Sequence, residues 1–149
     1  MSWYYENQII TEIPDEYIGF VYIITNTLNG RMYIGKKLSK FSKTSYKTVK
    51  LKNGTKKKKK IKSKIDSDWQ DYYGSSPNLI ADIQAQGKEN FRREILFYCS
   101  SKAELSYLEA KEQFDRRVLE TDDYYNGIIN LRVGESKLLR ESLLKHDKT

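Results

Sequence analysis

Residues 20–35 have the sequence FVYIITNTLNGRMYIG, and this stretch decides the fold. The segment from Phe20 to Thr25 is β-branched or aromatic on both alternating faces, which predicts a central strand buried on both sides. Asn29-Gly30 is a strong signal for a tight hairpin turn, and the segment from Met32 to Gly35 supplies the returning strand. The sequence therefore predicts a β-hairpin over residues 20–36.

The two-residue turn predicted for this hairpin determines which side chains share a face. It would place Lys37 opposite Tyr22, and directly opposed residues project from the same side of a sheet. That side would then carry Tyr22, Tyr33, Gly35 and Lys37. The missing side chain at Gly35 would leave room for a bulky group, such as a sugar-phosphate, to approach the backbone. A bulged three-residue turn would change the register and favour Lys36 instead.

A helix and a third strand follow in the middle of the chain. Ser76-Pro77 is typical of a capped helix start, and Gly87 predicts the end of this helix after about ten residues. Residues 91–99 alternate well enough to predict a strand. Its two faces would carry Phe91, Ile95 and Phe97 on one side and Leu96 and Tyr98 on the other.

The last third of the chain predicts two more helices. Ser101 and Glu104 form a capping box that opens a helix running to about Leu119. Residues 124–127 predict a turn, with Ile128-Ile129 as a short strand after it. A final amphipathic helix is indicated by Leu138, Leu139, Leu143 and Leu144, which either cover the core or form a dimer face. The predicted fold class is α+β, with a small antiparallel sheet of about three strands flanked by helices.

Positive charge is concentrated in one segment. The stretch from Lys36 to Lys64 contains 14 lysines and no arginine, aspartate or glutamate. Because unpaired ammonium groups are costly to bury, this stretch is predicted to be a solvated loop or arm. Its partner would be a polyanion, most simply nucleic acid, and the alternative is a disordered linker or a localisation tract.

Composition excludes several classes of protein. A chain of 149 residues is sufficient for about one domain, and its apolar runs are far shorter than the ~18 residues that a membrane span needs. The N-terminal residues show no signal-peptide pattern. A lone Cys99 and a lone His146 make an internal disulfide, a structural zinc site and a Ser-His-Asp triad improbable.

Two spaced tripeptides resemble those of the GIY-YIG nucleases. Tyr33-Ile34-Gly35 matches the second tripeptide, whereas Phe20-Val21-Tyr22 keeps only the tyrosine of the first. The resemblance covers residues 20–130 and is greatest to phage-borne homing-type endonucleases, which carry a segment like Tyr72 to Ser76 after a basic insertion. It implies a single nuclease domain over residues 1–149, with the insertion at about 37–65 and a helical extension at about 131–149.

The resemblance also implies a reaction, which is metal-dependent hydrolysis of a DNA phosphodiester. The family's metal-binding glutamate best matches Glu109, with Glu112 one turn further along, and one Mg²⁺ or Mn²⁺ ion is expected. Tyr22 or Tyr33 is the candidate general base, although an unperturbed phenol with a pKa near ~10 is protonated at neutral pH. The family's asparagine best matches Asn126, with Asn130 second.

One departure from the family concerns a cation. An arginine usually follows the second tripeptide, but no arginine occurs here between Arg31 and Arg92. Lys36, Lys37, Lys40 or Lys64 would substitute as point charges without the bidentate fork of arginine. The alternative function is therefore a non-catalytic nucleic-acid-binding module on the same fold.

The expected partner is double-stranded DNA. The lysines expected to contact it lie in the basic segment and are Lys40, Lys56, Lys57, Lys58, Lys59, Lys60 and Lys64. Otherwise the binding surface would be sought on Arg92, Arg93, Arg116 and Arg117. Recognition would be loose or depend on a homodimer, because little chain is left for a separate binding region. No membrane is expected, and the expected location is the cytoplasm, of a bacterial host if the protein is phage-encoded.

Overall fold

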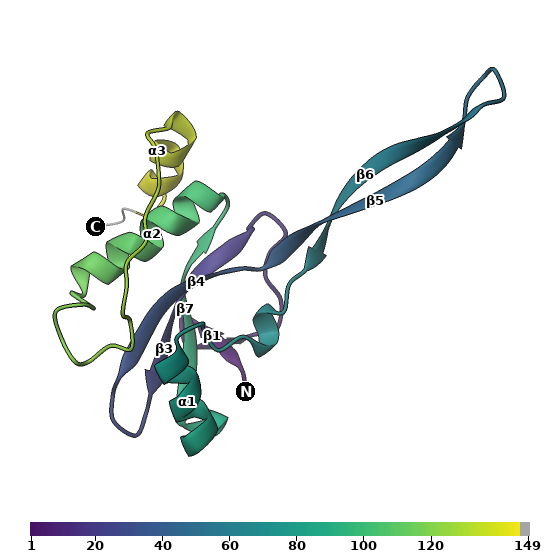
Figure 1. Ribbon diagram of the computed structural model, residues 1–149. Helices are drawn as coiled ribbons and strands as arrows, with labels where there is room; N and C mark the ends of the chain where they lie inside the picture. Colours follow the sequence, from purple (N-terminus) through teal and green to yellow (C-terminus); the bar gives the residue numbers. More distant parts are fainter. Residues whose placement is uncertain (147–149) are drawn as a thin grey trace.

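A five-stranded mixed sheet forms the centre of the structure, in the order β2-β1-β7-β3-β4 (Figure 1). The computed structural model describes residues 1–146. Strand β1 runs parallel to β7, and the other neighbouring strands are antiparallel. The α+β class is confirmed, but the sheet has five strands rather than about three. The strands are β1 Trp3–Tyr5, β2 Gln8–Ile10, β3 Gly19–Asn26, β4 Met32–Leu38 and β7 Phe91–Cys99.

The two strands of the central sheet that sequence analysis missed lie at the N-terminus. They are three residues long and turn at Glu6 and Asn7, both of which have positive φ without a glycine to signal it. Trp3 anchors them, because its buried indole donates a hydrogen bond to the carbonyl oxygen of Trp69 at 2.8 Å.

The β3–β4 hairpin forms as predicted, but its register is different. Tyr22 lies opposite Gly35, and Lys37 lies opposite Phe20. The connection is longer than two residues, because Gly30, with φ +77°, donates its N–H to the carbonyl of Asn26. The observed register differs from the predicted one by two residues. A shift of two keeps each side chain on its predicted face of the sheet, but it changes which residue lies opposite which.

The helices cover both faces of the sheet. On one face, α1 (Pro77–Gln86) packs with Tyr22 and Ile24, and on the other α2 (Lys102–Asp115) packs with Val21, Ile23 and Ile34. Short 3₁₀ turns occur at η1 (Trp69–Asp71) and η2 (Lys88–Asn90). In the predicted extension, α3 spans Lys137–Leu144, and residues 147–149 lie outside the described chain.

Two predicted boundaries in the last third are wrong. Helix α2 ends at Asp115 rather than near Leu119, because Arg117 adopts φ +54° and turns the chain so that Val118 enters the core. Residues 128–129 are not a strand, and the preceding segment pairs with β4 at an isolated bridge between Met32 and Tyr124.

A β-bulge changes the faces of β7. Val21 pairs with Phe97 and Tyr22 pairs with Ile95, so Leu96 is an extra residue without a partner on β3. The side chains beyond the bulge exchange faces, which places Phe97 on the α2 side and Tyr98 on the α1 side. The predicted faces of these two residues are therefore wrong.

The lysine-rich segment forms a two-stranded antiparallel ribbon that projects away from the body (Figure 1). Its strands are β5 (Lys40–Lys50) and β6 (Lys56–Asp66), and the turn at their far end contains Gly54 with φ +85°. At its base, the N–H of Ser39 donates to the carbonyl of Ile18, and the Ser67 hydroxyl donates to the carbonyl of Leu38. The segment is thus an arm with regular structure rather than a loop.

Arg93 is buried, with 1% of its surface exposed. Its guanidinium donates to the carbonyls of Gln70, Tyr72 and Met1, and lies over the rings of Trp3 and Tyr73. It therefore holds the N-terminus against the segment that follows the ribbon, and it is not part of a DNA-binding surface.

We expect Arg93→Met to lower the free energy of unfolding by about 3 kcal/mol, because three carbonyls lose their donor. The matched control is Arg92→Met, which removes a half-exposed ion pair with Glu94 and should cost less than about 1 kcal/mol. Urea unfolding followed by tryptophan fluorescence measures both. Equal losses in the two variants would contradict this account of Arg93.

Candidate active site

A pocket of about 490 Å³ lies at the open edge of β4, between α2, the start of α1 and the segment 125–130. Because β4 is an edge strand, side chains from both of its faces reach this pocket. Four of the predicted site residues line it, and these are Tyr33, Lys36, Glu109 and Asn126. The predicted alternative Asn130 lines it as well.

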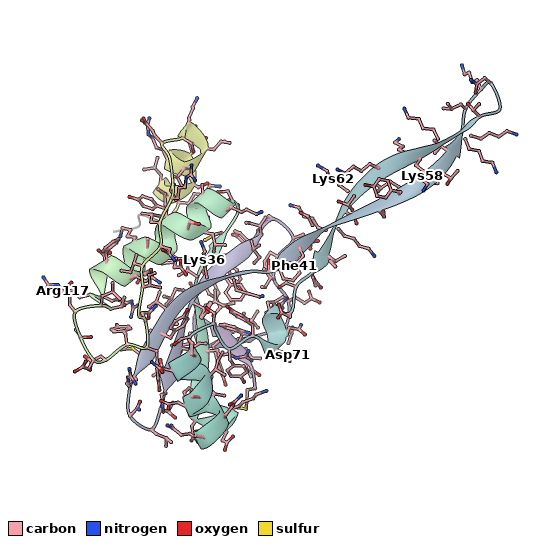
Figure 2. All side chains as sticks on the ribbon, viewed as in Figure 1. Lys36, Phe41, Lys58, Lys62, Asp71 and Arg117 are labelled. Carbon is pink, nitrogen blue, oxygen red and sulfur yellow. The ribbon has the colours of Figure 1, made fainter. Side chains whose placement is uncertain are left out.

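Glu109 and Lys36 are paired within this pocket. The Lys36 ammonium donates to the Ser106 hydroxyl at 2.8 Å and lies 4.0 Å from a Glu109 carboxylate oxygen (Figure 2 labels Lys36). Burial raises the pKa of Glu109, and the charge of Lys36 opposes that rise. The Glu109 side chain keeps 14% of its surface exposed, so its carboxylate is accessible to a small ligand.

Glu112 occupies a different environment. Its carboxylate accepts a hydrogen bond from Arg116 at 2.9 Å and lines an apolar groove of about 520 Å³ between α2 and α3. That groove contains neither Tyr33 nor Lys36. Of the two glutamates, the geometry therefore favours Glu109 as the site residue.

The two tyrosines differ in accessibility. The Tyr33 hydroxyl borders the pocket and lies 3.3 Å from the Ser75 hydroxyl. Burial raises the pKa of Tyr33, while the bond with Ser75 opposes that rise. Tyr22 is 1% exposed, and burial raises the pKa of its phenol well above the ordinary value.

The space above Gly35 is already filled. A Cβ atom at Gly35 would collide with the Tyr22 hydroxyl and would lie 2.9 Å from Cε1 of Tyr33. Gly74, with φ +89°, closes over the same phenol, since its Cβ would lie 3.4 Å from the Tyr22 oxygen. The expectation that Gly35 leaves room for a sugar-phosphate is therefore wrong, because it leaves room for Tyr22.

The remaining candidate lysines point elsewhere. Lys37 forms an ion pair with Asp68 at 2.6 Å, lowers the pKa of that carboxyl and lies over the ring of Tyr72. Lys40 pairs with Asp15 at the base of the ribbon. Lys64 and Lys56 to Lys60 are exposed along β6. Among the lysines suggested in place of the arginine, Lys36 is the one that lines this pocket in the described chain.

Asn126 is held by the backbone of β4. Its amide accepts from the N–H of Ile34 at 3.0 Å and donates to the carbonyl of Ile34 at 2.7 Å. Gln113 donates to the same carbonyl, and its own Oε1 is buried without a hydrogen-bond partner among the described residues. Sequence analysis missed Gln113 and Ser75 at the pocket, although the i+4 spacing of Gln113 from Glu109 on a predicted helix was a usable signal.

Comparison with known proteins identifies the family of this chain. A family model described as "Putative endonuclease segE, GIY-YIG domain" matches residues 3–129. The chain belongs to the GIY-YIG family. It is also 30% identical over 108 residues to "Putative endonuclease segD" of Enterobacteria phage T4, which covers 72% of this chain and 37% of that relative. The chain thus matches well under half the length of segD. No solved structure matches. Within residues 1–146, no helix has the length and apolar character needed to cross a membrane.

We expect Asn126→Ala to lower the free energy of unfolding by about 2 kcal/mol, because the buried N–H of Ile34 loses its acceptor. Asn130→Ala is the matched control, since Asn130 is exposed on the same segment and should change stability by less than about 0.5 kcal/mol. Thermal unfolding followed by circular dichroism measures both. A larger loss for Asn130→Ala would contradict this assignment.

Proposed function

We propose that this GIY-YIG protein is a metal-dependent DNA endonuclease of the phage homing type. The supporting observation is one pocket that combines a phenol, an ammonium group and a carboxylate, from Tyr33, Lys36 and Glu109. Hydrolysis of a phosphodiester needs a water positioned against the phosphorus, a group that takes its proton, and cations near the phosphoryl oxygens. The phenol would take the proton, and the ammonium group and a cation held by the carboxylate would lie near the phosphoryl oxygens.

Tyr33 is the proposed general base. Its hydroxyl borders the pocket, where it can contact a water, whereas the Tyr22 hydroxyl lies beneath Gly35 and Gly74. As the bond from the water oxygen to phosphorus forms, the water's proton moves to the phenolate oxygen of Tyr33; one ester bond breaks, and its leaving oxygen takes a proton from solvent. Because burial raises the pKa of Tyr33, the phenol must be deprotonated with help from nearby positive charge.

Glu109 fits one divalent cation. A single carboxylate suits Mg²⁺, which is commonly held by one or two carboxylates together with waters and phosphate oxygens. No group of three acidic, histidine or cysteine side chains arranged for a metal occurs within residues 1–146. A bound Mg²⁺ or Mn²⁺ would neutralise charge on the phosphoryl oxygens.

Lys36 supplies the cation expected from the family's arginine. Its ammonium lies close to Glu109 and its side chain is 40% exposed, so it can contact a phosphate oxygen as a point charge. The binding charge for duplex DNA comes from the lysines of the β5–β6 ribbon. The missing arginine is the specific observation that favours the second candidate function, a binding module without catalysis.

Glu109→Gln should lower the rate of plasmid cleavage in Mg²⁺ by about 10²-fold or more, because the carboxylate that holds the cation is lost. DNA affinity in EDTA should be unchanged or higher, since a negative charge is removed. In the metal-free protein, the pKa of the Glu109 carboxyl should lie above its ordinary value near ~4.3, because burial raises it.

Glu112→Gln is the control for this measurement and should retain normal cleavage. The reverse result, with loss only in Glu112→Gln, would move the metal site to the α2–α3 groove. Wild-type protein that binds DNA without cutting it in Mg²⁺ or Mn²⁺ would establish the binding module instead.

Tyr33→Phe should lower the cleavage rate by about 10²-fold, the usual contribution of a proton-transfer group. Tyr22→Phe removes a hydroxyl from the same sheet face and should change the rate far less. Single-turnover rates measured over a range of pH test both, with thermal unfolding as the check on folding. Loss in Tyr22→Phe alone would assign the base to the buried phenol, and normal rates in both would leave proton removal to another group.

A further inference from the structure

The two faces of the β5–β6 ribbon are chemically different. On one face, four successive cross-strand pairs each join a hydroxyl on β5 to a lysine on β6, namely Ser42 with Lys64, Thr44 with Lys62, Tyr46 with Lys60 and Thr48 with Lys58. We name this the hydroxyl–lysine face. The other face has no such run of pairs: it carries an apolar pair, Phe41 with Ile65, together with Ile61, Val49, two serines (Ser45 and Ser63) and four lysines.

The ribbon's charge is not neutralised within the protein. Lys58 and Lys62 lie along the projecting part of the ribbon, well away from the body (Figure 2). Among the ribbon's lysines, only Lys40 forms an ion pair with a residue that the structure describes. Lys47 lies directly opposite Lys59, and Lys50 opposite Lys56, which destabilises a two-stranded ribbon that is marginal on its own. A polyanion bound to the ribbon would relieve this repulsion.

The dimensions of the ribbon suit one groove of duplex DNA. Each strand has 11 residues, and at ~3.3 Å per residue this length is close to one turn of B-DNA. The major groove, about 12 Å wide, admits a two-stranded ribbon, whereas the major groove of duplex RNA is deep and narrow. The strong twist of the ribbon, visible in Figure 1, lets one face follow a helical groove.

We propose that the hydroxyl–lysine face lies in the major groove of duplex DNA, with the β6 lysines against the phosphates of one strand and the β5 hydroxyls against base edges. Hydroxyls of Ser and Thr accept from or donate to base edges, and lysines at the groove wall contact phosphate. The proposal rests on the proposed function in that DNA is the substrate, and it adds how the substrate is held and which side chains select its sequence.

The first test compares lysines on the two faces at equal charge. Lys58, Lys60 and Lys62 are replaced by Gln in one variant, and Lys47, Lys57 and Lys59 in the other. Affinity for a duplex is measured against salt concentration in EDTA. The first variant should flatten the log–log salt dependence by roughly 2 to 3 units, and the second by less than about 1. Equal flattening would overturn the assignment of the face.

The second test removes only hydroxyls. Thr44→Val, Tyr46→Phe and Thr48→Val are combined, and wild type and variant each select from a duplex pool with a randomised segment. The wild type should enrich a preferred sequence, and the variant should lose that enrichment with an unchanged salt dependence. The same enrichment in the variant, or none in the wild type, would overturn base contact by these hydroxyls.

Matched duplex RNA completes the design and should compete at least about tenfold less well than duplex DNA. Equal competition would overturn binding in the major groove. All three measurements are made in EDTA, so they are independent of cleavage. A protein that fails to cut DNA but shows the face difference refutes the proposed catalysis alone, whereas one that cuts DNA without the face difference refutes this inference alone.

Discussion

The packing of the Tyr22 phenol against the backbone of Gly35 sets the geometry around the pocket. Tyr22 comes from the central strand β3, so its position is fixed by neighbours on both sides, and Trp3, Tyr33 and Tyr72 surround its ring. Any side chain at position 35 would displace it. Packing alone therefore requires a glycine in β4 opposite the tyrosine of β3. The same glycine also leaves space for the ring of Tyr33, which lines the pocket.

The pocket exists because β4 is an edge strand whose polar groups are covered only locally. Main-chain hydrogen bonds with Asp123 and Tyr125 cover the edge at Met32, and the side chains of Asn126 and Gln113 satisfy the backbone of Ile34. Tyr33 from one face of the strand and Lys36 from the other reach the pocket beside this covered edge. An edge covered in this way supplies both an anchor for the segment 124–130 and an accessible surface.

Local sequence signals predicted the boundaries of some elements correctly. The predictions that were wrong concern features that depend on pairing between distant parts of the chain. The helix between Ser76 and Gly87 and the strand over residues 91–99 match, because capping and alternation are properties of a few neighbouring residues. The hairpin register, the bulge at Leu96 and the strands at the N-terminus depend on partners far along the chain. The ribbon was missed because lysine is depleted in strands, and its regular pairing is set across β5 and β6 rather than by propensity.

At the candidate site, too, local sequence signals were insufficient to identify the functional residues. Glu109 could be selected from its helix only through the family resemblance, since a helical glutamate carries no local mark of function. The choice between Lys36 and Lys37 depended on which face of β4 each side chain occupies. That criterion fails at an edge strand, because side chains from both faces can line the same pocket. Lys37 lies on the same face of β4 as Tyr33, as predicted, but its ammonium forms an ion pair with Asp68 and does not line the pocket.

Charge is divided between two parts of the molecule. The segment from Lys36 to Lys64 carries 14 lysines in a chain of net charge +7, so the remainder is net negative. The pocket itself holds one ammonium group and one carboxylate, which nearly cancel at long range. In the proposed function, long-range attraction of a polyanion would therefore come from the ribbon, and the pocket would contribute only short-range contacts to a phosphate. A lysine point charge at position 36 would then have only to complete the local neutralisation, which a monodentate contact can do.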